Sequence, residues 1–300
     1  MKILLLGKHG QVGWELQRSL SVIGEVIALD RSQTGGDLSE PMACSNFLRR
    51  EKPDVVVNAA AYTAVDQAEN ETELCRRINA TAVDEIAIAC SDIGALLVHF
   101  STDYVFAGTG TQSWREDDVT GPVNTYGQTK LEGEVAIRNS GCRHLIFRTS
   151  WVYGARGNNF AKTMLSLAQK RETLSVISDQ YGVPTGANLI ADVTAHVIRV
   201  CRLRDDLYGL YHLAPEGETT WFDYAKFCIE TARTTGVAIR VRPEAVLPIS
   251  SAEYKTAAVR PLNSRLNVKK IQDSFGLVMP DWQCGADRLL RQLLMKGIYE

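Results

Sequence analysis

The stretch that decides the fold is "KILLLGKHGQVGWEL" at residues 2–16, where an apolar run leads straight into a glycine-rich loop. Continuous apolar residues are typical of a strand covered on both faces of a parallel sheet. Gly7, Gly10 and Gly13 follow this run, and "WEL" opens an amphipathic stretch. Glycines between a strand and a helix permit a tight turn and let backbone amides approach a diphosphate. The stretch therefore predicts a strand, a phosphate-binding loop and a helix.

This loop is expected to hold the diphosphate of a dinucleotide. The spacing G-x-x-G-x-x-G differs from the G-x-G-x-x-G of ordinary dehydrogenases, so its weight comes from its place between a strand and a helix. The side chains of Lys8 and His9 either face the phosphates or belong to a solvated turn. The predicted cofactor contacts in this segment are Gly7, His9, Gly10, Gln11, Val12 and Gly13.

The first half of the chain repeats this alternation of short apolar runs and longer amphipathic stretches. The runs cover residues 3–6, 26–29, 54–58, 96–100 and 144–147, and the stretches between them cover 14–20, 39–51, 72–92 and a helix that begins near Pro122 and Asn124. Buried strands separated by helices indicate a parallel sheet with helices on both faces. The predicted fold class is a doubly wound α/β (Rossmann) domain.

The second half is richer in loops, with helical stretches at residues 159–171, 189–203, 221–235 and 284–296. It carries no repeat, low-complexity linker or charge block. We therefore expect a smaller C-terminal lobe that folds onto the first half and binds the substrate. The predicted division assigns 1–153 and about 187–208 to the dinucleotide-binding domain, and 154–186 and 209–300 to the lobe.

Bulk composition is that of an ordinary globular protein, with 45% hydrophobic and 23% charged residues among 300. A net charge of -2 argues against a broad surface for nucleic acid or anionic membrane. The seven cysteines show no C-x-x-C pair or metal-ligand spacing, which suggests free thiols in a reducing compartment. No signal peptide or membrane span is apparent. We expect a cytoplasmic protein with no nucleic-acid or membrane partner.

The second strand ends at Asp30, which is followed by Arg31. A carboxylate about 20 residues after the glycines is the usual partner of a ribose 2′-hydroxyl and favours NADH, whereas an arginine there accommodates the 2′-phosphate of NADPH. The residues leave both cofactors open. Further along, Asp37 and Leu38 either flank the adenine or belong to a helix cap at Ser39.

The reacting end is predicted where the fourth strand runs into "STDYVF" at residues 101–106. Ligands bind at the carboxyl ends of strands in such a sheet. Tyr126 and Lys130 lie four positions apart on a predicted helix and so point the same way. Together with the hydroxyl of Thr102 they form a carbonyl-reduction site, in which Tyr126 donates a proton to the forming alkoxide. We expect Lys130 and an oxidised nicotinamide to lower the pKa of Tyr126, and Thr102 to polarise the carbonyl.

Five further motifs occur in order with the glycine loop: "NAAAYT" (58–63), "STDYVF" (101–106), Y-x-x-x-K (126–130), "RTSWVYG" (148–154) and "RPLNSRL" (260–266). Together they resemble the dTDP-4-dehydrorhamnose reductase family of extended short-chain dehydrogenases over essentially the whole chain. The resemblance implies reduction of the 4-keto group of dTDP-6-deoxy-L-lyxo-4-hexulose to dTDP-L-rhamnose. It also implies a cofactor surface formed by Ala59, Ala60 and Ala61 after the third strand.

The resemblance assigns roles to the reacting end. Thr102, Tyr126 and Lys130 are implied to be catalytic, with Tyr126 and Lys130 also touching the cofactor. Thr102, Asp103 and Tyr126 are implied to contact the substrate, together with Trp151. From its own chemistry, Arg260 is a candidate for the substrate diphosphate, because a guanidinium makes paired charged hydrogen bonds. A core position for Trp151 and a loop-bracing role for Arg260 are the alternatives.

Two rival functions can be weighed from the residues. Sugar-nucleotide 4,6-dehydratases carry Asp-Glu after the threonine of the fourth strand, whereas Asp103 here is followed by Tyr104. The beta subunit of methionine adenosyltransferase has a similar fold but regulates a partner enzyme. The retained Thr102, Tyr126 and Lys130 favour an enzyme. Another nucleotide-sugar 4-ketoreductase is the remaining alternative.

Some members of the family form dimers in which carboxylates gather around a magnesium ion. Glu15 matches one such position, but Asn188 stands where a second carboxylate is expected. Because a hard cation prefers charged oxygen ligands, no metal site is predicted here, and magnesium is doubtful. The chain is expected to be a monomer or a homodimer.

Overall fold

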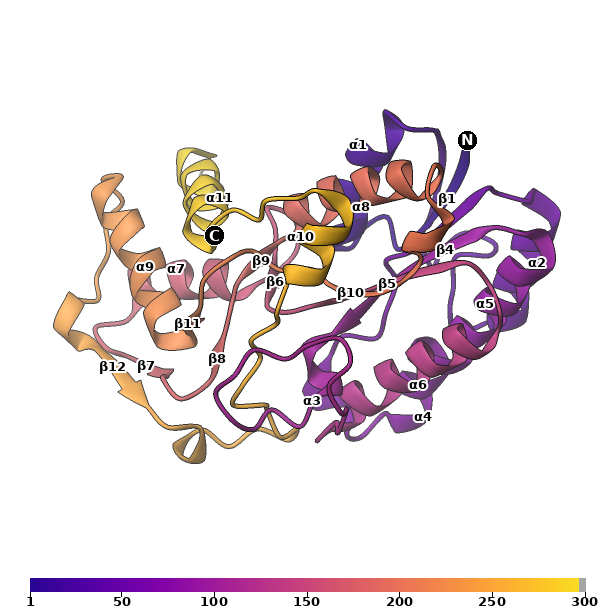
Figure 1. Ribbon diagram of the computed structural model, residues 1–300. Coiled ribbons are helices and arrows are strands. Elements are labelled where there is room, and N and C mark those ends of the chain that lie inside the picture. Colours follow the sequence, from indigo (N-terminus) through magenta and orange to yellow (C-terminus); the bar gives the residue numbers. More distant parts are fainter. Residues whose placement is uncertain (297–300) are drawn as a thin grey trace.

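The computed structural model describes residues 1–296, and its centre is a six-stranded sheet (Figure 1). The strand order is β10-β5-β4-β3-β1-β2, and each neighbouring pair is parallel. This arrangement confirms the predicted doubly wound α/β class. The strands are β1 (Lys2–Leu6), β2 (Glu25–Leu29), β3 (Val55–Asn58), β4 (Leu96–Thr102), β5 (His144–Thr149) and β10 (Gly209–His212).

Helices cover both faces of this sheet. Alternate residues of β1 show the division, because Ile3 and Leu5 pack into a core with α1 and α8, whereas Leu4 and Leu6 pack with α2 and α5. The helix α6 joins α5 on the second face (Figure 1). These helices are α1 (Gln11–Ser21), α8 (Ala187–Cys201), α2 (Pro41–Glu51), α5 (Ala82–Ile93) and α6 (Thr125–Asn139).

The predicted helix 72–92 forms as three consecutive pieces. The helix α4 (Thr72–Arg76) passes through a π-helical segment, Arg77–Thr81, into α5. A short helix, α3 (Val65–Ala68), precedes them, and a 3-10 turn, Asp103–Val105, follows β4. Single π-helical turns inside α-helices occur frequently at functional sites, and this one faces α6.

The second half contains the remaining three predicted helices, one helix at 269–275 that the sequence did not predict, and three two-stranded sheets. The helices are α7 (Phe160–Lys170), α9 (Trp221–Thr234), α10 (Lys269–Phe275) and α11 (Trp282–Lys296), and the paired strands are β6 (Val152–Tyr153) with β9 (Thr185–Gly186), β7 (Leu174–Ile177) with β12 (Val246–Ile249), and β8 (Tyr181–Gly182) with β11 (Thr219–Thr220). Short 3-10 turns lie at Asp205–Leu207, Pro243–Ala245 and Ser251–Glu253. The strand β10 pairs with β5 in the main sheet, although residues 209–212 fall in the predicted lobe. The division into two domains stays a prediction.

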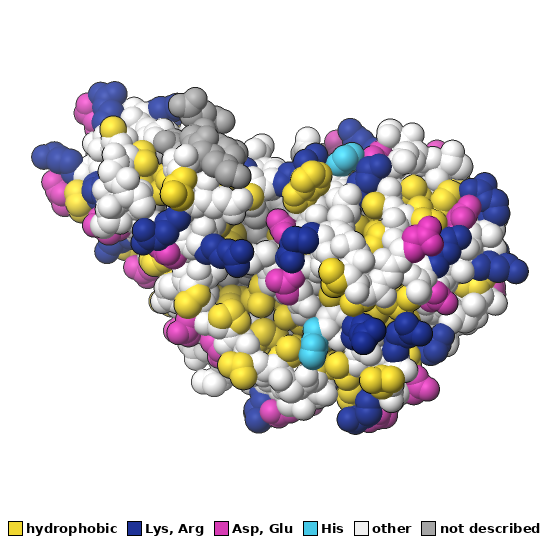
Figure 2. Space-filling view, turned by 90° about the horizontal axis from the view of Figure 1, so that it is seen from above, with side chains coloured by type: hydrophobic (Ala, Val, Ile, Leu, Met, Phe, Trp, Pro, Cys, Tyr) yellow, Lys and Arg dark blue, Asp and Glu magenta, His cyan; other side chains and the backbone are white. Residues whose placement is uncertain are grey.

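The surface shows no broad field of one charge on the face seen in Figure 2, where basic and acidic side chains are interspersed. Within residues 1–296, no helix combines the length and the apolar character that crossing a bilayer requires.

A buried ion pair attaches α6 to the sheet. Arg148 on β5 donates from Nε to Oε1 of Glu134 at 2.9 Å and from Nη2 to Oε2 at 2.7 Å. Ser101 on β4 donates to the same Oε1 at 2.5 Å. Both charged side chains are at most 1% exposed. The paired geometry and the added hydroxyl satisfy the carboxylate, as a buried charge requires.

Replacing Glu134 by Gln should destabilise the protein strongly, because the substitution leaves the Arg148 cation buried without its counter-charge. We expect a loss of about 3–5 kcal/mol in the free energy of unfolding, measured by urea denaturation. Asp206→Asn, which breaks an exposed pair with Arg204, is the matched control and should shift the transition little. Equal changes in the free energy of unfolding for the two variants would show that the buried pair of Glu134 with Arg148 stabilises the protein no more than an exposed pair does.

Candidate active site

The glycine loop lies between β1 and α1 and packs against the end of β3. Gly7 has φ +83°, and a Cβ there would lie 2.8 Å from the backbone nitrogen of Ala60. A Cβ on Gly13 would lie 2.1 Å from the carbonyl oxygen of Gly7, so the absence of a side chain lets α1 approach β1. The loop is therefore shaped by two close backbone approaches that no other residue permits.

Gly10, the middle glycine of the loop, has room for a side chain. A Cβ on Gly10 would meet only the Gly7 oxygen, at 3.4 Å. Gly10 is the N-cap of α1, no side chain caps this helix, and its first turn carries no acidic residue. Gln11 and Val12 begin the helix, so their amides belong to this uncapped end. An uncapped N-terminus with room above it fits a diphosphate, and the loop thus suits the predicted dinucleotide.

At the end of β2, Asp30 is surrounded by donors. Its Oδ2 lies 3.1 Å from Nζ of Lys8 and 3.1 Å from Nε2 of His9. Its Oδ1 accepts from the backbone nitrogen of Ser32 at 2.8 Å and from the Ser32 hydroxyl at 2.5 Å. The bonds from Ser32, and then Lys8, hold the pKa of Asp30 well below its usual range. Arg31 is exposed beside it, so this strand end offers one carboxylate together with several cations.

The predicted adenine segment forms a tight turn. Oδ1 of Asp37 accepts from the backbone nitrogen of Ser39 at 2.9 Å and from its hydroxyl at 2.8 Å, while Leu38 is buried. The helix α2 begins at Pro41 with Glu40 as its N-cap. Ser39 is therefore not the helix cap, and that alternative was wrong.

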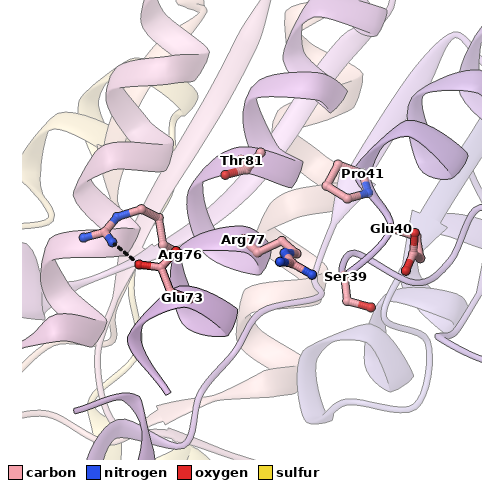
Figure 3. A pocket seen from close by; sticks show the side chains of 7 residues that line it. All are labelled: Ser39, Glu40, Pro41, Glu73, Arg76, Arg77 and Thr81. Carbon is pink, nitrogen blue, oxygen red and sulfur yellow. Dashed lines mark hydrogen bonds and ion pairs between the residues drawn. The ribbon is translucent and has the colours of Figure 1, made fainter. Parts of the chain in front are cut away.

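A pocket of about 330 Å³ lies next to this turn. Figure 3 shows that its walls come from the start of α2 and from α4 and the π-helical segment, with Arg77 reaching into it between them. It is lined by Ser39, Glu40, Pro41, Glu73, Arg76, Arg77 and Thr81. Apart from Ser39, no sequence motif singled out these residues, because the pocket forms only when segments far apart along the chain meet.

The structure brings Thr102 and Tyr126 together. Thr102 ends β4, is buried, and donates from Oγ1 to Oδ1 of Asp103 at 3.0 Å. Asn124 caps α6 by accepting from the nitrogen of Gly127 at 2.8 Å, which places Tyr126 in the first turn. A Cβ on Gly127 would lie 2.1 Å from the carbonyl oxygen of Tyr104. The helix therefore begins directly against the turn that carries Asp103.

Burial dominates the electrostatics of this cluster. It raises the pKa of Tyr126, with a further rise from the charge of Asp103 and an opposing effect of the Thr102 hydroxyl. Burial also raises the pKa of Asp103 to about 7. Asp103 Oδ2 is buried and has no hydrogen-bond partner among the described residues. The predicted lowering of the Tyr126 pKa by Lys130 is thus opposed in this structure, and it stays a prediction.

Lys130 lies one turn further along α6 and is fully buried. Its Nζ donates to the carbonyl oxygen of Phe100 at 2.6 Å and lies 3.0 Å from Nε2 of His99. Burial lowers the pKa of Lys130 to about 8, and Glu134 opposes this effect. Sequence reasoning missed His99 as a neighbour, because a histidine within the apolar run 96–100 reads only as part of a strand.

Ala59, Ala60 and Ala61 follow β3 and pass beside the glycine loop. The backbone nitrogen of Ala59 donates to Leu6 at 3.0 Å, and that of Ala60 donates to Oδ1 of Asn58 at 3.1 Å. All three alanines are partly exposed. Small side chains at this position leave room for a flat ligand over the strand end.

Trp151 and Arg260 lie in packed surroundings. Trp151 adopts a left-handed φ of +47°, and its ring stacks on Trp221 with centroids 3.7 Å apart. A Cβ on Gly182 would lie 2.8 Å from the Trp151 ring. Nη2 of Arg260 donates to Oδ2 of Asp66 at 2.6 Å. This ion pair matches the loop-bracing alternative for Arg260, and its contact with a diphosphate stays a prediction.

The position suggested for magnesium shows no ligand cluster. Among the described residues, no group of three or more His, Cys, Asp or Glu side chains is placed to hold a metal ion. Glu15 pairs with Arg18 at 3.6 Å.

The pH dependence of stability should reveal the buried carboxyl of Asp103. Its pKa is higher in the folded protein than in the unfolded chain, so its stabilising contribution is complete below pH ~4 and is lost as pH rises towards about 7. We expect Asp103→Asn to gain stability relative to the parent protein across this window, by up to about 1.4 kcal/mol per pH unit. Urea unfolding at several pH values measures the difference, and parallel curves for both proteins would contradict the assignment.

The whole chain is similar to one family of known proteins. The family model described as "RmlD substrate binding domain" matches residues 1–295. The dTDP-4-dehydrorhamnose reductase of Escherichia coli strain K12 is 53% identical over 295 residues, covering 98% of each chain.

Solved structures agree with this match. The dTDP-4-dehydrorhamnose reductase of Clostridium acetobutylicum superposes with a TM-score of 0.89 at 36% identity, covering 98% of this chain and 99% of that one. The Bacillus anthracis reductase, solved in complex with NADP, gives 0.86 at 33% identity and covers 97% and 99%.

Proposed function

The chain belongs to the RmlD substrate binding domain family, and from that premise we propose that it is an NADPH-dependent reductase of a dTDP-linked 4-keto sugar. It reduces the 4-keto group of dTDP-4-dehydrorhamnose to give dTDP-L-rhamnose, the last step of dTDP-rhamnose synthesis. The single observation that carries the chemistry is the close approach of Thr102 and Tyr126 at the end of β4, with Lys130 buried one turn away.

NADPH supplies the hydride when it is bound, and the protein supplies the proton and the orientation. In our proposal Thr102 donates a hydrogen bond to the carbonyl oxygen and Tyr126 transfers its phenolic proton to that oxygen. The half-buried phenol, held by α6 against the turn after β4, limits competing proton exchange with water. Asp103 and Trp151 are proposed to contact the sugar, and Arg260 the diphosphate.

The charges beside Asp30 support NADPH. Lys8 already balances this carboxylate at 3.1 Å, and Arg31 lies exposed at the same strand end. A 2′-phosphate at this position would meet cations, and a 2′-hydroxyl would meet the carboxylate. We therefore propose that NADH is accepted as well. The relative preference for the two cofactors stays a prediction, as do a monomeric or homodimeric state and a cytoplasmic location.

The alternative of a regulatory subunit, like the beta subunit of methionine adenosyltransferase, differs in one testable respect. It needs the cofactor fold but not Thr102, Tyr126 and Lys130, which this chain retains. A different 4-keto sugar nucleotide as substrate is the second alternative.

Turnover should depend on the phenol of Tyr126. With purified protein, dTDP-4-dehydrorhamnose and NADPH or NADH in parallel, loss of reduced-nicotinamide absorbance reports the reaction. We expect Tyr126→Phe to lower kcat by about 10²–10⁴-fold, because the proton donor is lost, while NADPH binding is kept. The matched control is Tyr208→Phe, which removes a hydroxyl next to Asp205 and Cys201. Tyr208 precedes the first residue of β10 and so lies at the opposite end of the sheet from Thr102.

Two outcomes would overturn parts of this proposal. A folded Tyr126→Phe protein that binds NADPH and reduces the sugar at the normal rate would refute the assigned proton donor. Cofactor binding by the parent protein without turnover would favour the regulatory role, and turnover of another 4-keto sugar nucleotide alone would redefine the substrate.

The two glycines of the loop should respond differently to alanine. Gly10→Ala has room for its Cβ, so the fold should persist while the Kd for NADPH rises by about tenfold, equivalent to ~1.4 kcal/mol. Gly13→Ala places a methyl group 2.1 Å from the Gly7 oxygen and should destabilise the protein itself. Fluorescence titration and thermal unfolding separate the two effects, and equal melting temperatures for both variants would contradict the packing argument.

A further inference from the structure

A buried chain of polar groups runs from β3 to Lys130. Nδ2 of Asn58 lies 3.2 Å from Nδ1 of His99, and Nε2 of His99 lies 3.0 Å from Nζ of Lys130. The three side chains are each only 1% exposed. None of the motifs that define the site includes Asn58 or His99 in a catalytic role. Buried polar groups of this kind require fully matched donors and acceptors.

The direction of these hydrogen bonds can be worked out from one end. The backbone nitrogen of Ala60 donates to Oδ1 of Asn58 at 3.1 Å, which turns the amide nitrogen of Asn58 towards His99. An amide nitrogen can only donate, so Nδ1 of His99 must accept. A neutral imidazole carries one proton, and burial together with the charge of Lys130 holds the pKa of His99 well below its usual range. The proton of His99 is therefore on Nε2, facing Lys130.

This tautomer distinguishes the two protonation states of Lys130. An ammonium group has three donors and no acceptor. At 3.0 Å its N–H bonds would face the Nε2–H bond of His99, and this contact between two donors is unfavourable. A neutral amine has a lone pair that accepts the Nε2 proton. The carbonyl oxygen of Phe100 accepts from Nζ at 2.6 Å in either state. The arrangement thus stabilises the neutral amine.

The other charged groups near Lys130 do not share this effect. Glu134, on the same helix, favours the ammonium but is already bound by Arg148 of β5 and Ser101 of β4. Cys75 of α4 acts on Lys130 in the same direction as Glu134, but more weakly. Tyr126, on the same face of α6, is the group that Lys130 is proposed to serve.

We propose that His99, with its tautomer fixed by Asn58, is a positioning residue that makes Lys130 release its proton to Tyr126 after each reduction. The proposal rests on the proposed function, in which Tyr126 gives its proton to the substrate oxygen. Lys130 then gives one Nζ proton to the phenolate of Tyr126, so that the phenolic O–H bond forms again. The neutral amine of Lys130 accepts a hydrogen bond from Nε2–H of His99, which keeps its proton. Lys130 recovers its own proton from water. A catalytic group that exchanges protons near neutral pH is effective in this role.

The first test reads the tautomer directly and needs no turnover. In protein labelled with ¹⁵N in its histidine rings and saturated with NADPH, the two ring nitrogens give different signals when protonated and unprotonated. His99→Gln identifies the His99 signals among the five histidines. We expect a protonated Nε2 and an unprotonated Nδ1 above pH 6. A protonated Nδ1 would overturn the proposal, whatever the substrate of the protein is.

The second test reads the pH profile of kcat. The amide of His99→Gln can turn its oxygen towards Nζ and accept from the ammonium, so the fall of kcat at alkaline pH should move up by about one pH unit, and kcat at neutral pH should fall. An unchanged profile in a folded His99→Gln protein would refute the role of His99.

A third variant keeps the proposal testable if His99→Gln fails to fold. Asn58→Asp still accepts from the Ala60 amide but accepts from Nδ1 as well, which reverses the tautomer. In the ring spectra the protonated and unprotonated signals should exchange, and the alkaline limb should again move up. In a His99→Leu background no imidazole is present, so Asn58→Asp changes the charge near Lys130 without changing a tautomer. Equal shifts in both backgrounds would show that charge, and not the tautomer of His99, governs Lys130.

Discussion

The site depends on how closely α6 is held against β4, β5 and the turn that follows β4. Glycines at 127 and 133 remove the side chains that would separate the helix from Tyr104 and from the π-helical segment, where a Cβ would lie 2.1 Å and 2.3 Å from carbonyl oxygens. Lys130 and Glu134 then supply polar anchors to Phe100 and Arg148. The glycines allow α6 to lie close to its neighbours, and the buried charges of Lys130 and Glu134 fix its position along the sheet. The phenol of Tyr126 is thereby placed beside Thr102.

The pKa values at the glycine loop and at the reacting end are shifted by different causes. At the glycine loop, hydrogen bonds from Ser32 and Lys8 stabilise the charged form of Asp30, and added salt screens the ion pair of Asp30 with Lys8. At the reacting end, burial acts on every titratable group, raising the pKa of Asp103 to about 7 and lowering that of Lys130 to about 8. Hydrogen-bond direction then decides which ring nitrogen of His99 carries the proton.

Local sequence patterns predicted most of the strands and helices of the fold. The glycine loop appears between an apolar run and an amphipathic stretch, as predicted. Six further helices, α2, α6, α7, α8, α9 and α11, lie where the residues indicate. Tyr126 and Lys130 share one face of α6 because they are four positions apart. The strand β10 escaped notice because "GLYH" is short and pairs with β5 across a long sequence separation. The contact between Asn58 and His99 was missed because the two residues meet only across the assembled sheet, and a histidine inside an apolar run reads only as part of a strand. The residue roles themselves remain predictions from chemistry.

Trp151, which follows β5, contacts the first turn of α9, a helix far away along the chain. Its indole lies flat on Trp221, the first residue of α9, and is backed by Gly182. A non-glycine residue with a positive φ stores conformational energy that its surroundings must offset. The stack therefore ties the backbone conformation of Trp151 to the first residue of α9, because the Trp221 ring is among the contacts that offset the cost of the positive φ.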